Sequence, residues 1–297
     1  MNVGIVGGGQ WGQALATLVA SAGHLARIGT RGGRPIGFAS TPNIEALARE
    51  SDLLMLAVPS DAMADAVDAA RPDAGTMVLI AGRGMNTREG GWVSDYITEK
   101  TPCRRVGALA GPALASEVVS GRPTALLVAS PFDEVCRATR EVLHSEHCRL
   151  YTTPDLRGVE LAGAMVRALA VAVGIADGLD YGLGARGVII TRGIAEASRL
   201  GAALGADPRT FSGLAGVGDL VSCASSQGHP SHAAGRSLAR GGGISERLTD
   251  EVRALIALGR SQGVDLPLTD AVLTISEGHE SPRLVFDGLM RRAARSE

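Results

Sequence analysis

The chain has 297 residues, of which 45% are hydrophobic and 20% are charged, and its formal net charge is −2. This length suits one large domain or two ordinary ones, and the nearly balanced charge suits a globular protein. Basic residues are dispersed and aromatic residues make up only 3%, so no nucleic-acid-binding surface is predicted.

The first sixteen residues combine a short strand, a glycine cluster and the start of a helix. Gly7, Gly9 and Gly12 have the spacing G-x-G-x-x-G, between an apolar run at Val3–Val6 and an amphipathic segment at Trp11–Ala20. In a dinucleotide-binding motif the first glycine turns the chain, the second admits the pyrophosphate and the third lets helix and strand pack closely. The following helix presents free N–H groups to the phosphates. The alternative is a glycine-rich turn without a ligand.

The segment that contains the second predicted strand, His24–Pro35, has no acidic residue. An acidic residue about 20 positions after the glycines would bind the ribose 2′-hydroxyl of NAD, whereas arginine suits the 2′-phosphate of NADP. Thr30, Arg31 and Arg34 therefore predict NADP as the preferred cofactor, with NAD as the second choice. The alternative is that both arginines are solvated loop residues.

Six apolar runs in the first half of the chain are predicted to be strands, and helical segments such as Ile44–Glu50 and Ala62–Ala70 separate several of them. The predicted strands are Val3–Val6, Leu25–Gly29, Leu53–Val58, Met77–Ala81, Val106–Ala110 and Ala125–Ala129. Continuous apolar strands between helices indicate a parallel sheet covered on both faces. We therefore expect an α/β fold with an N-terminal Rossmann-type doubly wound sheet, whose ligand lies along the carboxyl ends of the strands.

After about Thr153 the pattern becomes helical, without a convincing strand. We expect a dinucleotide-binding (Rossmann) domain at residues 1–153 and an all-helical substrate domain at residues 154–297. The longest apolar run, Leu161–Ala176, contains Arg167 and is shorter than the roughly 20 residues that span a bilayer. It is interpreted as a core helix, and neither a membrane span nor a signal peptide is predicted.

The four cysteines have no C-x-x-C pair and no metal-ligand spacing, and they are Cys103, Cys136, Cys148 and Cys223. They are interpreted as reduced thiols of a cytoplasmic protein. Three consecutive glycines, Gly241–Gly243, predict a mobile loop.

Five blocks of the sequence resemble the bacterial NAD(P)-dependent glycerol-3-phosphate dehydrogenases, and the similarity covers nearly the whole chain. The blocks are GGGQWGQALA (7–16), DLLMLAVPS (52–60), AGPALASEV (110–118), GVELAGAMVRALAVAVGIADGLDYG (158–182) with ITRGIAEASRLG (190–201), and GLAGVGDL (213–220). The resemblance implies a homodimer in which a helical domain closes over dihydroxyacetone phosphate and hydride passes between nicotinamide and the carbonyl carbon. It implies cofactor contacts from Gly7, Gly9, Gln10, Trp11, Gly12, Arg31, Pro59, Arg83 and Ala115. It implies substrate contacts from Gly111, Asp219, Ser231 and Arg167.

The residues that react in that family are altered in this chain. The family's catalytic lysine, in G-A-[LM]-K-N, falls on Val166, which can neither donate nor accept a proton. The neighbouring Arg167 points about 100° away around the helix. We expect Arg167 to pair with Glu160, seven residues earlier, because buried charges must be paired. Lys100 is the only lysine of the chain, and a guanidinium is a poor proton donor near neutral pH.

Three further positions of the family pattern differ. A second lysine, which contacts cofactor and substrate in the family, aligns with Arg83 and so keeps its charge. The serine or threonine of G-P-[ST]-F-A is Ala113. The family arginine that binds the substrate phosphate aligns with Pro230.

Without the lysine, the candidate catalytic residues are Asp219, His229, His232 and Arg83, and Tyr181 is a further possible proton donor. Both histidines lie in the polar segment SSQGHPSH, and a pKa near 6.5 suits acid–base chemistry. The alternative is that they are exposed loop residues. A metal site formed by these histidines with Asp219 is a weaker reading, and no metal is predicted.

Other readings of three aspartates remain open. Asp219 lies in the glycine-rich GVGDL, and its alternative role is a helix N-cap. Asp177 and Asp180 are predicted to end a helix ahead of Gly178 and Gly182.

The residues that contact the cofactor in the family are kept. The groups that would hold a substrate phosphate and supply a proton have changed together. We therefore expect an NAD(P)-dependent oxidoreductase of the glycerol-3-phosphate dehydrogenase type, with a small carbonyl or hydroxy substrate that is altered or turned over weakly. Two alternatives stay open. One is a reductase of a non-phosphorylated carbonyl or imine compound, and the other is a non-catalytic dinucleotide-binding accessory protein.

Overall fold

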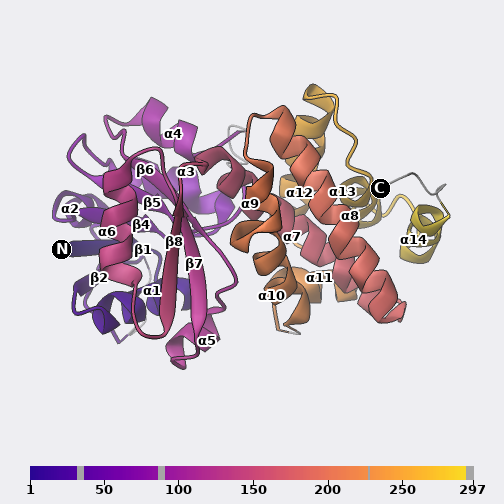
Figure 1. Ribbon diagram of the computed structural model, residues 1–297, viewed down its shortest axis with the longest axis horizontal. Coiled ribbons are helices and arrows are strands. Elements are labelled where there is room, and N and C mark those ends of the chain that lie inside the picture. The colour runs from indigo at the N-terminus through magenta and orange to yellow at the C-terminus, as the bar shows by residue number, and fades with distance from the viewer. Residues whose placement is uncertain (32–36, 86–90, 227, 292–297) are drawn as a thin grey trace. The chain divides into compact units, whose positions relative to one another are not determined.

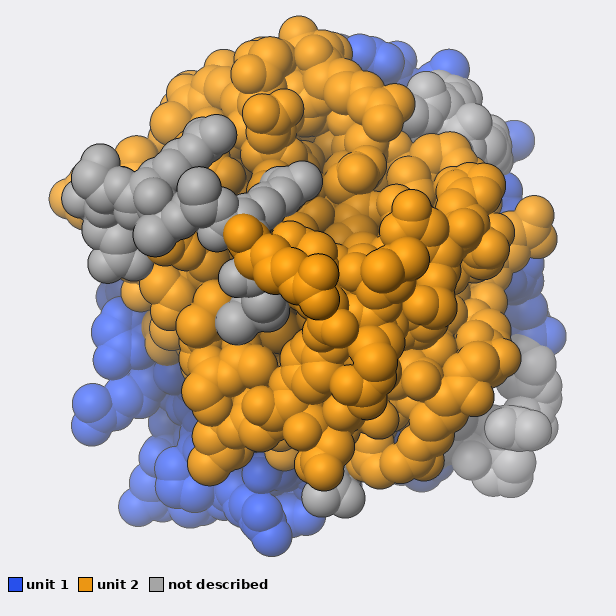
Figure 2. All heavy atoms as spheres, turned by 90° about the vertical axis from the view of Figure 1, so that its right-hand side faces the viewer, with its two compact units in different colours: residues 1–160 blue, residues 161–297 orange. Residues whose placement is uncertain are grey.

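The computed structural model describes residues 1–31, 37–85, 91–226 and 228–291. The chain divides into two units, Met1–Glu160 and Leu161–Glu297 (Figure 2). The division falls inside a long helix, seven residues after the boundary predicted from the sequence.

An eight-stranded sheet forms the centre of the first unit, with the order β3-β2-β1-β4-β5-β6-β7-β8 (Figure 1). Its strands are β1 (Asn2–Val6), β2 (Leu25–Gly29), β3 (Ser40–Thr41), β4 (Leu53–Leu56), β5 (Met77–Ile80), β6 (Val106–Ala110), β7 (Thr124–Ala129) and β8 (Cys148–Thr153). Every residue of β4 and β6 is buried, as in a parallel sheet with helices on both faces.

The helices of the first unit form two layers on this sheet. They are α1 (Gln10–Ser21), α2 (Ile44–Arg49), α3 (Met63–Ala70), α4 (Val93–Lys100), α5 (Ala115–Val119) and α6 (Asp133–Leu143), with a short 3₁₀ turn at Ser60–Ala62. Helix α1 packs with α5 and α6, whereas α3 packs with α2 and α4. This arrangement confirms the predicted Rossmann-type doubly wound fold, since successive crossovers place helices on opposite faces.

The sheet differs from the prediction at both edges. At one of them, the two-residue strand β3 was not predicted. Strands β6 and β7 are antiparallel, with Ala108 opposite Ala129, so the expectation of an entirely parallel sheet is wrong there. Strand β8 was not predicted, because its buried and exposed residues alternate instead of forming an apolar run. Arg149 and Tyr151 point outward from it, which suits a strand with only one neighbour.

The second unit is helical throughout the part that the structure describes. Its elements are α7 (Leu156–Gly178), which begins in the first unit, α8 (Gly182–Ala203), α9 (Pro208–Ser212), a π-helical turn η2 (Leu214–Gly218), α10 (Asp219–Ser225), α11 (Pro230–Ala239), α12 (Glu246–Ser261), α13 (Pro267–Ser276) and α14 (Pro282–Met290). Asp177 lies in the last turn of α7. Asp180, in the link to α8, has the left-handed φ of +61°.

Helix α7 is the core of the second unit. It is long and apolar enough to cross a membrane, but 94% of its most apolar window is buried inside the protein. From Leu161 to Ala176 every residue except Arg167 is buried. Its length and composition therefore reflect packing on all sides by other helices.

Two glycines set the distance between α7 and α11. A Cβ at Gly174 would lie 2.1 Å from the His232 carbonyl oxygen, and one at Gly235 would lie 2.1 Å from the Val171 carbonyl oxygen. Because backbone atoms cannot move aside cheaply, the two helices approach this closely only with glycine at both positions.

We predict that Gly235→Ala lowers the free energy of unfolding by about 1–3 kcal/mol, because the added methyl group forces α11 away from α7. The matched control is Gly187→Ala on α8, where a Cβ would have no neighbour within 4 Å. The control is expected to be neutral or to stabilise by up to about 1 kcal/mol, since alanine favours helix. Urea denaturation of both variants tests this, and equal effects would refute the packing argument.

Candidate functional site

The three glycines of the motif have two different roles. Gly7 has a φ of +120°, and a Cβ on it would lie 2.4 Å from the Ala57 carbonyl oxygen. A Cβ on Gly12 would lie 1.9 Å from the Gly7 carbonyl oxygen. Both are therefore required by backbone packing between β1, α1 and β4. A Cβ on Gly9 would meet no protein atom within 4 Å, so this glycine borders open space.

That open space is part of a pocket of about 460 Å³ at the carboxyl ends of β1, β2 and β4. Its walls come from Gly7–Gly9, Gly29–Arg31 and Ala57–Pro59, together with one face of α3 that includes Asp65. Helix α1 begins at its rim with Gly9 as N-cap, without a side-chain cap and without an acidic residue in the first turn. The free N–H groups and positive dipole end fit a pyrophosphate. This pocket, called the glycine cradle below, thus fits a dinucleotide.

The residues expected to choose between the two cofactors lie at the end of β2. Thr30 and Arg31 line the pocket, and the Thr30 amide donates to the Thr41 carbonyl oxygen at 3.0 Å. Arg34, the other expected phosphate ligand, lies outside the described residues. Asp65 lines the pocket from α3 and was not predicted, because it lies in an ordinary helical segment without a motif.

The carboxyl ends of β5 and β6 are joined to this cradle. The Trp11 indole Nε1 donates to the Ala81 carbonyl oxygen at 2.7 Å, which ties the first turn of α1 to the end of β5. Two residues later, the Arg83 guanidinium donates to the Gly111 carbonyl oxygen at 3.4 Å. Arg83 therefore lies at the edge of the sheet where the dinucleotide is expected.

The remaining expected cofactor residues also lie at this edge. Gln10 is the first residue of α1, Pro59 is an exposed wall of the pocket, and Ala115 begins α5, which packs on α1.

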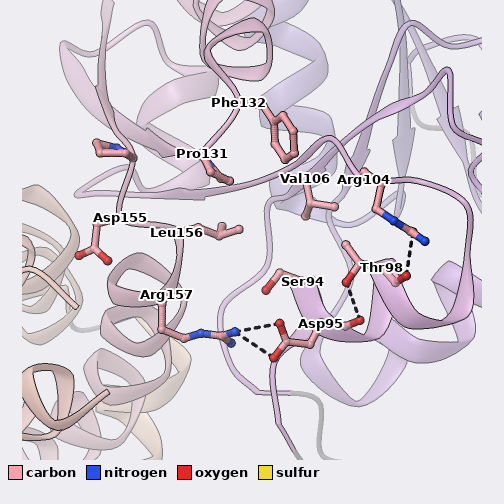
Figure 3. Close-up of a pocket in the computed structure, with 11 residues that line it drawn as sticks. Ser94, Asp95, Thr98, Arg104, Val106, Pro131, Phe132, Asp155, Leu156 and Arg157 are labelled. Carbon is pink, nitrogen blue, oxygen red and sulfur yellow. Dashed lines mark hydrogen bonds and ion pairs between the residues drawn. The ribbon is translucent and has the colours of Figure 1, made fainter. Parts of the chain in front are cut away.

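Helix α4, which follows Arg83 in the sequence, is held against the first turns of α7 (Figure 3). The backbone N–H and the hydroxyl of Ser94 donate to the buried Glu160 carboxylate at 3.0 and 2.5 Å. Arg157 donates to both carboxylate oxygens of Asp95, at 2.8 and 2.9 Å, and stacks over the Trp92 ring. These contacts place the start of α7 in the first unit.

Figure 3 also shows a pocket of about 320 Å³ beside these residues. It includes Val106, the first residue of β6, and so lies at the amino end of that strand. The glycine cradle lies at the opposite, carboxyl ends of the strands. The Arg157 guanidinium in its wall is bound to Asp95, and that of Arg104 donates to carbonyl oxygens including that of Thr98. Because these cations already have acceptors, we do not assign this pocket to a charged substrate.

In the second unit, Asp219 is the first residue of α10 and is fully buried. Its N-terminal neighbour Gly218 is the N-cap, so the alternative that Asp219 caps the helix is wrong. The Cys223 thiol donates to its carboxylate at 3.5 Å. The preceding π-helical turn depends on Gly216, where a Cβ would lie 1.9 Å from the Phe211 carbonyl oxygen. Such turns often occur at functional sites.

Helix α7 presents Val166 where the family resemblance places a lysine, and this side chain is buried. Arg167 pairs with Glu251 of α12 at 3.0 Å. The expected pair with Glu160 is wrong, because seven residues of helix separate the two by about 10 Å along the axis. The Glu160 carboxylate is instead bound by Ser94.

Helix α11 holds two of the predicted site residues in unexpected surroundings. Ser231 and His232 are buried, so the alternative that His232 is an exposed loop residue is wrong. The His232 Nε2 lies 2.7 Å from the Asp177 carboxylate, which also accepts from Arg186 at 2.5 Å. Burial alone would raise the pKa of Asp177, but the hydrogen bonds from Arg186 and His232 outweigh it and lower the pKa.

The hydrogen bond to Asp177 fixes where the His232 imidazole lies along α7. Asp177 is eleven residues after Val166, or about 16 Å along the helix axis. His232 is therefore held at the far end of α7 from the position of the family lysine. His229 is the half-buried N-cap residue of α11.

Among the described residues, no group of three or more His, Cys, Asp or Glu side chains could hold a metal ion.

Two family profiles match this chain, one for each part of it. The family profile described as NAD-dependent glycerol-3-phosphate dehydrogenase N-terminus matches residues 35–136, and the corresponding C-terminus profile matches residues 155–287. The chain is 34% identical to a glycerol-3-phosphate dehydrogenase [NAD(P)+] of Salinibacter ruber, over 100% of this chain and 97% of the relative. It is 33% identical to that of Streptomyces coelicolor, over 100% and 98%.

Solved structures agree with this result. The crystal structure of glycerol-3-phosphate dehydrogenase from Coxiella burnetii has a TM-score of 0.90 and 26% identity, covering 98% of this chain and 99% of that one. The yeast (Saccharomyces cerevisiae) enzyme has a TM-score of 0.79 at 19% identity, covering 97% and 98%, which shows a common fold.

We predict that Glu160→Gln weakens the pH dependence of stability. Burial raises the pKa of Glu160 above its ordinary value of 4.5, although the Ser94 hydrogen bonds oppose the shift. A raised carboxyl pKa gives stability that is present below the ordinary value and lost as the pH rises through the folded value. Glutamine cannot ionise and keeps an oxygen for Ser94.

Urea denaturation of both proteins between about pH 4.5 and pH 8 measures this effect. The free energy of unfolding of the variant should rise relative to that of the wild type as the pH rises. Glu45→Gln, at the surface pair with Arg49, is the control for the loss of a carboxylate at the surface. A pH-independent difference between Glu160→Gln and the wild type would contradict the prediction.

Proposed function

Because the chain belongs to the NAD-dependent glycerol-3-phosphate dehydrogenase family, we propose that it is an NAD(P)-dependent oxidoreductase acting on CH–OH groups. The proposed reaction interconverts dihydroxyacetone phosphate and sn-glycerol 3-phosphate, or a related small carbonyl and hydroxy compound. We propose that this activity is weak or has moved to another substrate, because Val166 stands where the family resemblance places the proton-transferring lysine.

The observation that carries this proposal is the open space at Gly9. The N–H groups of the first turn of α1 would hold the pyrophosphate, and Thr30 and Arg31 would hold a 2′-phosphate, which favours NADP over NAD. When bound, the dinucleotide supplies or accepts the hydride. Pro59 forms one wall of the cradle, and Trp11 ties the first turn of α1, which borders it, to the end of β5.

Three side chains are proposed to act on the substrate. The Arg83 guanidinium, at the edge of the sheet beside Gly111, would stabilise negative charge that develops on the carbonyl oxygen. A guanidinium gives up a proton poorly, so this group supplies electrostatic help without acid catalysis. The Asp219 carboxylate would bind the substrate hydroxyl groups. His229, at the start of α11, is the proposed proton donor in place of a lysine.

In this proposal, the other predicted residues of the second unit hold helices in place or lie beside the substrate. His232 holds α11 against α7 through Asp177, and Arg167 holds α12 against α7 through Glu251. Ser231, buried at the start of α11, is proposed to lie beside the substrate.

The test of function is NADPH oxidation by the purified protein with dihydroxyacetone phosphate and, separately, with hydroxyacetone. We expect slow oxidation with at least one of these ketones. A clear preference for hydroxyacetone would identify a substrate without phosphate. If NADPH binds but neither ketone nor an imine panel is reduced, the proposed enzymatic function is wrong and an accessory role replaces it.

We also propose that the protein is a cytoplasmic homodimer. All four cysteines are buried free thiols, and burial raises the pKa of Cys148 to about 11. Thiols of this kind react slowly with oxidants, as suits a reducing compartment without need for disulfides. Sedimentation analysis tests the dimer, and a monomer at micromolar concentration would exclude it.

Arg31→Gln is expected to raise the KM for NADPH about tenfold and to leave the KM for NADH nearly unchanged, because a charge-assisted bond to the 2′-phosphate is lost. Arg27→Gln on β2, the strand that precedes Arg31, is the control, since Arg27 pairs with Glu50. Steady-state kinetics with both cofactors make the comparison. A similar rise for NADH would place Arg31 outside the specificity pocket.

Asp219→Asn is expected to lower kcat about 100-fold while NADPH affinity changes less than about twofold, because a carboxylate is lost from the substrate side only. The control is Asp250→Asn, an exposed residue that pairs with Arg253. Initial rates and a fluorescence titration of NADPH measure the two effects. An unchanged kcat in this variant would show that Asp219 does not belong to the site.

A further inference from the structure

The glycine tract Gly241–Gly243 is not used by either part of the proposed active site, yet it has a defined structure. Gly241 has a φ of +80°, and a Cβ on Gly242 would lie 2.3 Å from the Ser237 hydroxyl and 3.1 Å from its carbonyl oxygen. The Gly242 amide donates to the Ser237 carbonyl oxygen at 2.9 Å, and the Ser237 hydroxyl donates to the Gly243 carbonyl oxygen at 3.3 Å. The tract therefore folds back on the last turns of α11 at a place where only glycine fits.

This fold-back forms a pocket of about 420 Å³ whose polar side chains are cationic or neutral. It is lined by Ala233, Arg236, Ser237, Arg240 and Gly242. Arg236 and Arg240 are one helical turn apart, so both guanidinium groups lie on the same side of α11. No carboxylate belongs to the lining.

Neither guanidinium has an acceptor among the residues that the structure describes, although Arg236 is half-buried. Two other arginines of the second unit have carboxylate acceptors, since Arg253 donates to Glu277 and Arg186 donates to Asp177. The negative end of the α11 dipole attracts cations, but it leaves the five N–H donors of each guanidinium unfilled. Partial burial of a charged donor without a partner is unfavourable, and an anion in the pocket would remove this cost.

We propose that this pocket binds an oxyanion, the phosphate or carboxylate group of a small metabolite, through the guanidinium groups of Arg236 and Arg240. Guanidinium groups match such anions in bidentate fashion, and the Ser237 hydroxyl is within the same pocket. The site is separate from the glycine cradle, which belongs to the first unit and has its own arginine, Arg31.

The test measures the melting temperature of the full-length protein with inorganic phosphate, and in a second arm with malonate, each against potassium chloride of equal ionic strength. NADPH is present at saturation, so that the cradle is filled. A ligand well above its Kd should raise the melting temperature by about 2 °C. The arm that gives the larger rise identifies phosphate or carboxylate as the preferred group.

Arg236→Gln and Arg240→Gln should each weaken the affinity for the stabilising anion about tenfold, the loss of one charge-assisted contact. The matched control is Arg260→Gln, at an exposed arginine elsewhere in the same unit. This change should leave the affinity for the anion unchanged. The same series in an Arg31→Gln background separates this pocket from the cradle.

The proposal is overturned if neither anion stabilises the wild type beyond potassium chloride, or if the effect survives in Arg236→Gln. It is also overturned if only Arg31→Gln removes the effect, since the anion would then occupy the cradle. None of these outcomes depends on turnover of a ketone, so the proposed enzymatic function is judged separately.

Discussion

Close backbone packing between β1, α1 and β4 is the constraint on which the rest of the site depends. Gly12 brings α1 against the Gly7 carbonyl oxygen, and Gly7 lies against Ala57 at the end of β4. This packing aims the uncapped N-terminus of α1 at the pocket and brings Trp11 within reach of β5. A cradle for a dinucleotide, with Arg83 nearby, follows from these contacts in the first unit alone.

Ion pairs and hydrogen bonds to carboxylates hold the helices of the second unit together. Asp177 joins α7, α8 and α11 through Arg186 and His232, and Glu251 joins α12 to α7 through Arg167. A charged group held in this way is less available to a substrate, because breaking a buried pair exposes an uncompensated charge. The unit keeps the architecture of its family, and the proposed change in its proton-transfer chemistry rests on the buried valine at position 166.

The sequence predicted what depends on local pattern, and missed what depends on partners from distant segments. The glycine spacing and the apolar runs predicted the doubly wound sheet, whereas β8 escaped notice because an edge strand alternates. The partner of Arg167 was misassigned, since helical spacing cannot reveal Glu251 on another helix. The alternative of an exposed loop for His232 ignored Pro230, because proline is common at the first position of a helix and α11 begins there.

The most direct test of the account is calorimetric titration of NADPH into the wild type and Gly9→Ala. The φ of −71° at Gly9 suits any residue and its Cβ would touch no protein atom, so the variant should fold and melt like the wild type. The methyl group would occupy the space assigned to the pyrophosphate, so NADPH affinity should fall at least about tenfold. Equal affinity in the two proteins, or no binding to the wild type, would contradict the account.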